Sequence, residues 1–408
     1  MTQRNFPDTE LMPPPIKGSD EGSFAHSSVA VRLGVIAKRV IAENNYPPEI
    51  VENLEKLIQE IPYGLVRPIQ DTHSPDLAEW TSYLTPFLNY NWLEIPWYFA
   101  EAYFYRRILE ATHYFQPGRW QAVDPFLYQK HLGLSTAIDA IAAISNFVNN
   151  AIQDIHPNKT YLRELIYFDL WGNRADMSLW PAGEADQNRV ESEREQSYIL
   201  ADDTSKVVDR IASFSSTRID FIIDNAGFEL IGDLCIADFL LATNAAATVY
   251  FHLKAHPTFV SDATIKDVNH TTEFLAKSSD RDVKTFALRL KNYIANHRLK
   301  LCEHLFWTSP LPLWEMPDSV VNDLARSHLI FLKGDANYRR SIDDRHWPFT
   351  TPYQDIVSYF PAPLVALRTL KSELAAGLQT AQIEILNHQD PDWLTNGQWG
   401  VIQFVDRS

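Results

Sequence analysis

The stretch Ile219-Asp-Phe-Ile-Ile-Asp-Asn-Ala-Gly-Phe-Glu229 decides the fold, because an apolar run stops abruptly at a carboxylate, an amide and a glycine. Isoleucine and phenylalanine favour a short buried strand, and Gly227 allows the chain to turn. Glu229 then opens an apolar helical run. In open α/β sheets, a turn between a strand and a helix lines the crevice beyond the carboxyl ends of the strands. We therefore expect Asp224, Asn225 and Glu229 to face a ligand.

The side chains of this turn indicate which ligand it binds. Carboxylate and amide oxygens suit a hard divalent cation, magnesium or manganese, better than zinc. An alternative is that Asp224 and Asn225 only form an Asx turn and cap the following helix. The motif by itself leaves both interpretations open, and we therefore ask whether the pattern recurs elsewhere in the chain.

Composition excludes several classes of function. The chain has 408 residues, of which 45% are hydrophobic, and this predicts a fully folded protein. Its net charge of −16 argues against binding to nucleic acid or to an anionic membrane, since both require a positive field. The first fifteen residues contain no apolar signal core, and no apolar run of about 20 residues follows. We expect a soluble cytoplasmic protein, with a local basic cluster for any ligand that carries phosphate.

The texture of the sequence changes along the chain. Residues 1–25 are rich in Pro, Gly, Ser and acids, which predicts a mobile arm. Helical periodicity dominates residues 26–180 and predicts a helical domain. Residues 181–204 are polar and predict an exposed connection. Short β-rich runs then alternate with helices over residues 205–408, as is typical of an α/β domain with a mainly parallel sheet.

Polar residues follow four of the predicted strands, and this recurrence supports a binding site. They are Asp224 and Asn225 after the first run, Asp262 after 247–254, Asp335, Asn337 and Arg339 after 328–332, and Arg368 and Lys371 after 363–367. Because the carboxyl ends of parallel strands lie on the same side of a sheet, we expect these side chains to converge. Each motif taken alone has an alternative as a plain turn, a helix cap or an exposed helix start.

The converging groups predict a type of chemistry. Acidic and amide oxygens supply a cation site, while Lys333, Arg339, Arg368 and Lys371 supply the positive field that a phosphate needs in an acidic protein. A cation beside a phosphate clamp is the arrangement used for phosphoryl transfer or for hydrolysis of a phosphate ester. The predicted partner is therefore a small-molecule phosphate ester.

Other enzyme templates do not fit the sequence. The Asp-x-Asp phosphatase signature requires an acid where this chain has Ala226. No Gly-x-Gly-x-x-Gly or P-loop sequence occurs, and no His-Glu-x-x-His helix is present. His252, His256 and His270 lack a spacing suited to a metal ligand set.

Several motifs together resemble one known family, the metal-dependent damage-control phosphatases. The resemblance spans about residues 25–408 and is carried by 224–229, 259–262, 333–339 and 368–371, with weaker similarity at 98–107 and 171–178. The Arg-Thr-x-Lys ending at 368–371 resembles the subgroup that acts on sugar phosphates.

This resemblance implies a three-layer α/β/α core preceded by a helical domain, and phosphatase activity on phosphometabolites such as fructose 1-phosphate or fructose 6-phosphate. Reasoning from the residues leaves both Asp262 and Asp335 open as metal ligands, and the resemblance favours Asp262. It implies that Asp224, Asn225 and Asp262 hold a divalent cation, typically manganese, magnesium, cobalt or nickel. The residues implied around the substrate are Glu229, Asp335, Asn337, Tyr338, Arg339 and Lys371.

We expect Asp224, Asn225, Asp262 and Asp335 to form the catalytic group, and Lys333 and Arg368 to add to the phosphate clamp. Two alternatives remain at this stage. A second description of the family implies methylation of protein carboxylates with S-adenosylmethionine, which no glycine-rich nucleotide loop supports. The other alternative is a non-catalytic binder of sugar phosphates that depends on a metal.

Overall fold

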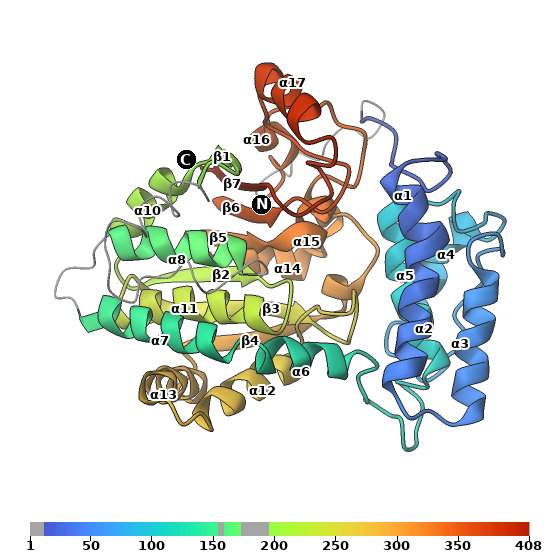
Figure 1. Cartoon of the computed structure of the whole chain (residues 1–408), viewed down its shortest axis with the longest axis horizontal. Helices are drawn as coiled ribbons and strands as arrows, with labels where there is room; N and C mark the ends of the chain where they lie inside the picture. Colours follow the sequence, from blue (N-terminus) through green and yellow to red (C-terminus); the bar gives the residue numbers. More distant parts are fainter. Residues whose placement is uncertain (1–11, 154–158, 173–195, 408) are drawn as a thin grey trace.

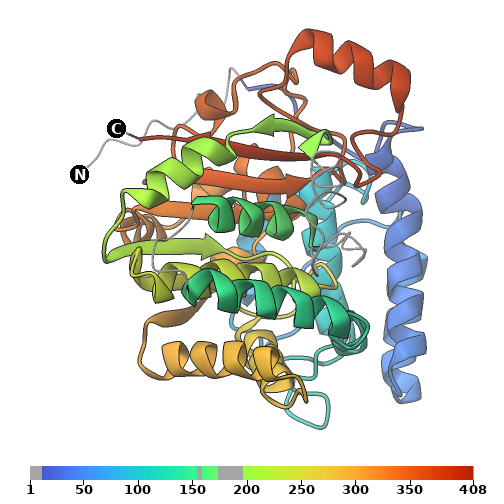
Figure 2. The ribbon, with the colours of Figure 1, turned by 60° about the vertical axis from the view of Figure 1, so that its left-hand side comes forward.

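The computed structural model of the chain describes residues 12–153, 159–172 and 196–407. The first eleven residues of the predicted arm, residues 181–195 of the predicted connection and residues 173–178 of the weaker motif lie outside the described residues. Figure 1 shows a sheet with helices on both of its faces and a layer of helices beyond the ends of the strands, and Figure 2 shows the same arrangement from another side. The predicted α/β class, with a mainly parallel sheet and helices at the N-terminal side, is confirmed.

One seven-stranded sheet forms the centre of the molecule, in the order β1-β7-β6-β5-β2-β3-β4. The strands are β1 (Ile199–Asp202), β2 (Thr217–Ile222), β3 (Ala246–Lys254), β4 (Leu299–His304), β5 (Leu329–Lys333), β6 (Leu364–Thr369) and β7 (Gly400–Val405). All neighbouring pairs are parallel except β6 and β7. β2 lies between β5 and β3, so its carboxyl end lies in the middle of the row formed by the ends of the strands.

The prediction of an exposed connection is wrong for its last described residues. Residues 199–202 form β1, which pairs with β7 through Ala201 and Val401 and takes the edge of the sheet. A strand of four residues at an edge is too short to show a clear alternation of apolar and polar residues. The sequence pattern therefore did not reveal it.

Two hydrophobic cores lie on opposite faces of the sheet, because successive side chains of a strand point to opposite sides. Phe221 and Phe331 stack with ring centroids 4.4 Å apart and enter the core on the side of α7, α8 and α11. Ile222 and Leu332, each one position further along, enter the other core. The helices of the sheet part are α6 (Leu127–Ser135), α7 (Ile138–Gln153), α8 (Lys159–Trp171), α10 (Thr204–Ala212), α11 (Phe228–Ala242), α12 (Ile265–Ala276), α13 (Arg281–Ala295), α14 (Asp318–Leu324), α15 (Gly334–Ser341), α16 (Tyr353–Ile356) and α17 (Thr380–Gln389), with short 3₁₀ turns η4 (Leu305–Thr308) and η5 (Leu313–Glu315).

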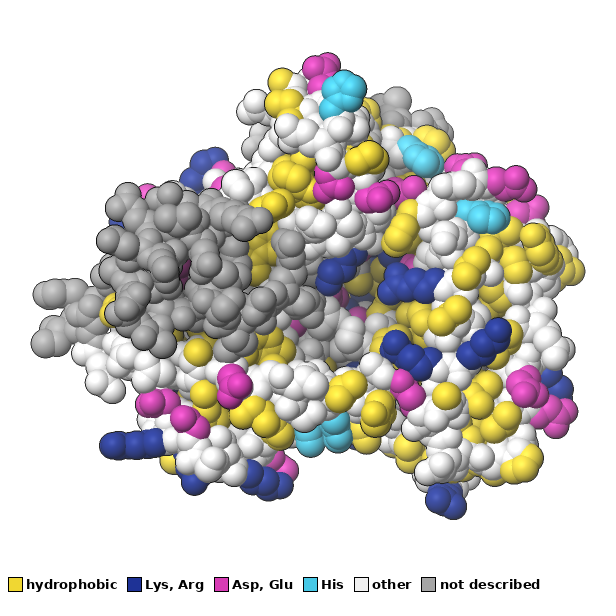
Figure 3. All heavy atoms as spheres, in the orientation of Figure 1, with side chains coloured by type: hydrophobic (Ala, Val, Ile, Leu, Met, Phe, Trp, Pro, Cys, Tyr) yellow, Lys and Arg dark blue, Asp and Glu magenta, His cyan; other side chains and the backbone are white. Residues whose placement is uncertain are grey.

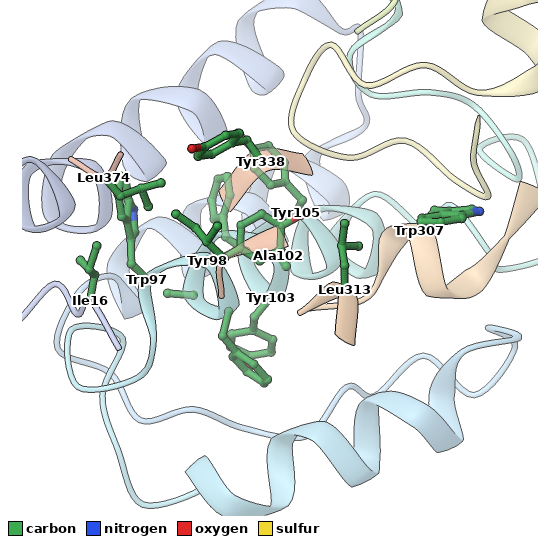
Figure 4. Packing of buried hydrophobic residues seen from close by; sticks show 14 of the residues in the cluster. Ile16, Trp97, Tyr98, Ala102, Tyr103, Tyr105, Trp307, Leu313, Tyr338 and Leu374 are labelled. Atoms are coloured by element: carbon green, nitrogen blue, oxygen red, sulfur yellow. The ribbon is translucent and has the colours of Figure 1, made fainter. Parts of the chain in front are cut away.

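The remaining helices form what we call the helical layer. It consists of α1 (Phe24–Ser27), the π-helical turn η1 (Ser28–Arg32), α2 (Leu33–Glu43), α3 (Pro48–Glu60), α4 (Leu77–Leu84), the 3₁₀ turn η2 (Thr85–Phe87) and α5 (Trp97–Ala111). Every residue of α5 is buried. Its aromatic side chains join the core that also contains Tyr338, Leu313 and Trp307 of the sheet part, as Figure 4 shows. One continuous core therefore connects the helical layer to the sheet.

Residues 26–180 are not confined to the helical layer. α7 and α8 pack on α11 and cover one face of the sheet. α7 does so through a buried stripe that includes Ile141, Ile144 and Val148, at the spacing of one helix face. The predicted division between residues 26–180 and 205–408 remains a prediction.

The described part of the N-terminal segment is built into the helical layer. Ile16 is 3% exposed, its N–H donates to the carbonyl of Asp344, and its carbonyl accepts from the N–H of Trp97. In the described part of the chain no single helix is long and apolar enough to cross a membrane, although α6 and α7, bent by 64° at a short break, together meet that test of length and composition.

Candidate active site

Backbone pairing between two loops brings the predicted metal ligands together. One loop follows β2 and carries Asp224 and Asn225, and the other follows β3 and carries Asp262. The N–H of Ala263 donates to the carbonyl of Asp224 over 2.8 Å, and Asn225 and Asp262 form an isolated antiparallel bridge. The two loops thus cross beyond the sheet, so that residues from different strands meet at one point.

Side chains reinforce this crossing. Ser261 Oγ donates to Asn225 Oδ1 over 2.5 Å, and the carbonyl of Ser261 accepts from the N–H of Ala226 over 2.7 Å. Asn225 Nδ2 donates to Glu229 Oε2 over 2.8 Å, from the loop to the first turn of α11. The amide oxygen and nitrogen of Asn225 are therefore both held in a fixed direction.

Asp224 is one of the two buried acids in this predicted ligand set. It is 4% exposed, and among the described residues none donates a hydrogen bond to its shielded Oδ1 atom. Burial raises the pKa of Asp224 well above its usual value, and the negative charges of Asp262 and Glu229 raise it further. A carboxylate in this setting is stabilised by a cation at Oδ1. The oxygen-rich donor set fits a hard divalent ion.

Gly334 lets the backbone approach Asp224 closely. It opens α15 with φ of +78°, and a Cβ atom built on it would lie 1.8 Å from Asp224 Oδ2. No side chain fits in that space. The glycine of the Lys-Gly-Asp motif thus has a steric role beside the cluster as well as a conformational one.

Lys254 and Asn337 hold the cluster of Asp224, Asn225 and Asp262 in place from the side of the sheet. Lys254 Nζ lies 3.1 Å from Asp262 Oδ2 and donates to Asn337 Oδ1 over 3.2 Å. Asn337 Nδ2 donates to the carbonyl groups of Lys333 over 2.9 Å and Ile223 over 3.2 Å. Burial raises the pKa of Asp262, although the ammonium group of Lys254 offsets part of this effect. These contacts tie the ends of β2, β3 and β5 together.

Asp335 lies at the centre of a second group of polar contacts. Its Oδ1 accepts from Arg368 Nε over 2.8 Å, from Ser372 Oγ over 2.9 Å and from the N–H of Lys371 over 3.3 Å. Burial raises the pKa of Asp335, but the guanidinium groups of Arg368 and Arg339 outweigh burial, and the pKa is lowered overall. Asp335 is thus an ionised carboxylate that fixes the backbone of Lys371, whose side chain is exposed.

Lys333 lies within the core. It is 1% exposed, and its Nζ atom lies 2.6 Å from Asp169 Oδ2 and 3.2 Å from Asp233 Oδ1. Burial raises the pKa of Asp169 to about 6, against the opposing effect of Lys333. Burial also raises the pKa of Asp233. The ammonium group of Lys333 thus balances two acids from α8 and α11.

Two further residues of the predicted substrate group also have defined partners. The guanidinium group of Arg339 lies 2.6 Å from Glu101 on α5 and 2.8 Å from Asp344. Tyr338 donates from its hydroxyl to Gln403 Oε1 over 2.9 Å. The structure therefore brings Asp224, Asn225, Glu229, Asp262, Asp335 and Asn337 to one edge of the sheet, with Arg339 facing the helical layer.

A different group of potential metal ligands lies further back in the sheet. Within the described ranges, Asp220, His252 and Asp323 offer ligand atoms within 4.8 Å of one another. Arg218 donates from Nε and Nη2 to Asp220 over 2.9 and 2.7 Å, and from Nη2 to Asp323 over 2.8 Å. A guanidinium group bound to both carboxylates already offsets part of their charge and occupies their oxygen atoms. A metal ion would have to displace it, so the cluster around Asp224 is the better cation site.

Comparison with known proteins identifies the family. The family model of the damage-control phosphatase ARMT1-like domain matches residues 28–386. The chain belongs to this family. The damage-control phosphatase ARMT1 of Mus musculus is 33% identical over 95% of this chain and 98% of that protein, and the one of Homo sapiens is 32% identical over 97% and 99%. A DUF89 family protein from Pyrococcus horikoshii superimposes with a TM-score of 0.44 and 14% identity over 85% of this chain and 92% of that chain.

Two predictions from the sequence motifs are thereby confirmed: the damage-control phosphatase family and the enzyme class, a phosphatase. Sequence reasoning missed Lys254 and Asp169, and it did not assign Glu101 to the site. Lys254 is the last residue of a predicted strand, so the argument that drew attention to the other strand ends applies to it as well. Asp169 and Glu101 lie within apolar helices, and their partners are distant in sequence.

The approach of Gly334 to Asp224 gives a first prediction for this family member. Gly334→Ala places a methyl group on Asp224 Oδ2, so the carboxylate has to move. We expect Mn²⁺ to bind about tenfold more weakly or worse, measured by calorimetry on protein stripped of metal. Gly22→Ala is the matched control, since Gly22 has φ of +89° but open space around it. Unchanged Mn²⁺ affinity in Gly334→Ala would contradict the assignment of Asp224 as a ligand.

The buried position of Lys333 gives a second prediction. Lys333→Met leaves Asp169 and Asp233 without their cation, and we expect it to lower the free energy of unfolding by about 3 kcal/mol in a denaturant titration. Lys206→Met, which removes an exposed ion pair with Asp203, should change it by less than about 1 kcal/mol. If Lys333→Met instead keeps its stability and raises KM for a phosphate ester, the phosphate contact predicted from sequence is supported.

Proposed function

We propose that this chain is a divalent-metal-dependent phosphatase for small sugar phosphates such as fructose 1-phosphate or fructose 6-phosphate. The observation that carries the proposal is the buried Oδ1 atom of Asp224, to which no described residue donates a hydrogen bond. Asp224 lies next to the bridge between Asn225 and Asp262. Asp224, Asn225 and Asp262 would hold manganese, magnesium, cobalt or nickel. The cation would polarise a phosphoryl oxygen and stabilise the charge that develops there.

Lys371 supports the phosphate part of the proposal. Its side chain is exposed, its backbone is fixed by Asp335, and its charge is close enough to lower the pKa of Asp224. Figure 3 shows a hollow in the surface between the two parts of the molecule, with Lys and Arg side chains on its rim. A side-chain ammonium group such as that of Lys371 would hold the phosphate oxygens by charge, and the ester bond would face the acidic cluster.

The remaining residues orient the substrate in this proposal. Asp335 is ionised and accepts hydrogen bonds, so it suits a sugar hydroxyl or an attacking water as a partner. Asn337 and Lys254 hold the loop ends from below, and Arg368 fixes Asp335. Lys333 and Arg339, which are paired with buried acids, shape the walls of the site through those pairs.

Removal of Asp262 tests the proposal directly. We expect Asp262→Ala to reduce metal-stimulated release of phosphate by roughly 100-fold or more while the circular dichroism spectrum is retained. Asp323→Ala is the matched control, because it removes a carboxylate from the group around Arg218 and should leave the stimulation by metal in place. Retained activity in Asp262→Ala would remove the metal assignment.

A panel of phosphorylated metabolites tests the substrate class. The protein is stripped with a chelator, reloaded separately with Mg²⁺, Mn²⁺, Co²⁺ or Ni²⁺, and assayed for release of phosphate. We expect no release without metal and the fastest release from fructose phosphates. Metal-dependent binding without release would indicate a binder, and tight binding of S-adenosylmethionine without release would indicate a methyltransferase.

A further inference from the structure

The turn immediately before Asp262 has an unusual backbone. Phe259 has φ of +45° and Val260 has φ of +65°, a region that residues with a side chain rarely adopt and that a β-branched residue adopts least of all. The N–H of Ser261 donates to the carbonyl of Phe259 over 2.8 Å, which closes a γ-turn centred on Val260. A turn of this kind persists only where surrounding contacts hold it.

The same turn controls both loops of the site. Ser261 binds the side chain of Asn225 through Oγ and the backbone of Ala226 through its carbonyl. Asp262 follows directly in the chain. A relaxation of the turn would therefore move the oxygen atoms of Asn225 and Asp262 together, without any change in the sheet.

Two aromatic residues of the helical layer hold the turn in place. The ring of Phe259 stacks on Tyr98 with centroids 5.2 Å apart and an angle of 22°, and it lies 4.8 Å from the ring of Tyr105 at 36°. Tyr98 and Tyr105 lie two turns apart on the same side of α5, and they are 6% and 4% exposed. Phe259 thus contacts two buried rings from the helical layer, and both of these tyrosines are labelled in Figure 4.

The face of α5 that contacts Phe259 is itself bound to the sheet part. The N–H of Tyr98 donates to Asp344 Oδ2 over 2.9 Å. Glu101, which lies between the two tyrosines on this face, pairs with Arg339 at 2.6 Å and accepts from Ser28 Oγ over 2.7 Å. The position of the two rings is therefore set by contacts that do not involve the turn.

We propose that Phe259, Tyr98 and Tyr105 are positioning residues that hold the strained turn and so set the geometry of the divalent-cation site. By this inference the helical layer completes the metal site without supplying a ligand to it. The inference rests on the proposed function, since it takes Asp262 and Asn225 as ligands.

The experiment measures the affinity of metal-free protein for Mn²⁺ by electron paramagnetic resonance of the unbound ion. Phe259→Leu keeps an apolar side chain but loses the ring stacking on Tyr98. Tyr105→Leu removes one of the two rings that contact Phe259 and leaves the sequence of the turn unchanged. We expect Mn²⁺ to bind about tenfold more weakly to Phe259→Leu, and more weakly than wild type to Tyr105→Leu. At saturating Mn²⁺, kcat for phosphate release should return close to that of the wild type.

Two controls separate positioning from stability. Tyr103→Leu removes a buried ring from the same helix that stacks on Trp92 at 4.6 Å, and it should leave Mn²⁺ affinity unchanged. Tyr105→Phe keeps the ring and should also bind Mn²⁺ like the wild type. Equal Mn²⁺ affinity in the wild type, Phe259→Leu and Tyr105→Leu would overturn the inference. A wild-type protein that binds none of Mn²⁺, Mg²⁺, Co²⁺ and Ni²⁺ would instead contradict the proposed function.

Discussion

The crossing of the loops after β2 and β3 is the constraint on which the candidate site depends. Two acids, Asp224 and Asp262, are brought into one buried cluster by the hydrogen bond from Ala263 to the Asp224 carbonyl and by the bridge between Asn225 and Asp262. Burying carboxylates together is unfavourable unless positive charge compensates them. Because the pairing of the two backbones buries two carboxylates together, positive charge is needed to stabilise them at the carboxyl ends of the strands.

The surrounding residues follow from the same demand. Buried cations lie against buried or partly buried acids in several places: Lys254 at Asp262, Lys333 at Asp169 and Asp233, Arg368 at Asp335, and Arg339 at Glu101 and Asp344. Removing one member of such a pair leaves an uncompensated buried charge, so these groups hold the loops in one arrangement. Lys371 differs from these cations because its side chain is exposed. Lys371 therefore places a positive group at the surface of a chain whose net charge is −16.

The helical layer is part of the same arrangement. It shares a hydrophobic core with one face of the sheet, and the Glu101–Arg339 pair lies buried between the two parts. Its aromatic helix α5 is buried along its whole length, and one face of this helix touches the loop that carries Asp262. The aromatic residues of α5 thus pack against the chain segment that precedes the predicted ligand Asp262.

The sequence by itself determined the four strands that carry the predicted site, their polar ends and the family. Apolar runs that stop at Asp224, Lys333 and Arg368 are local patterns, and such patterns can be recognised within a single segment of the sequence. Only the tertiary structure decided which charges meet. The partners of Lys333, Asp169 and Asp233, come from two different helices, and Phe259 meets its tyrosines across more than a hundred residues of chain. Such pairings depend on how the helices and loops pack in space, and no periodicity within a single segment encodes them.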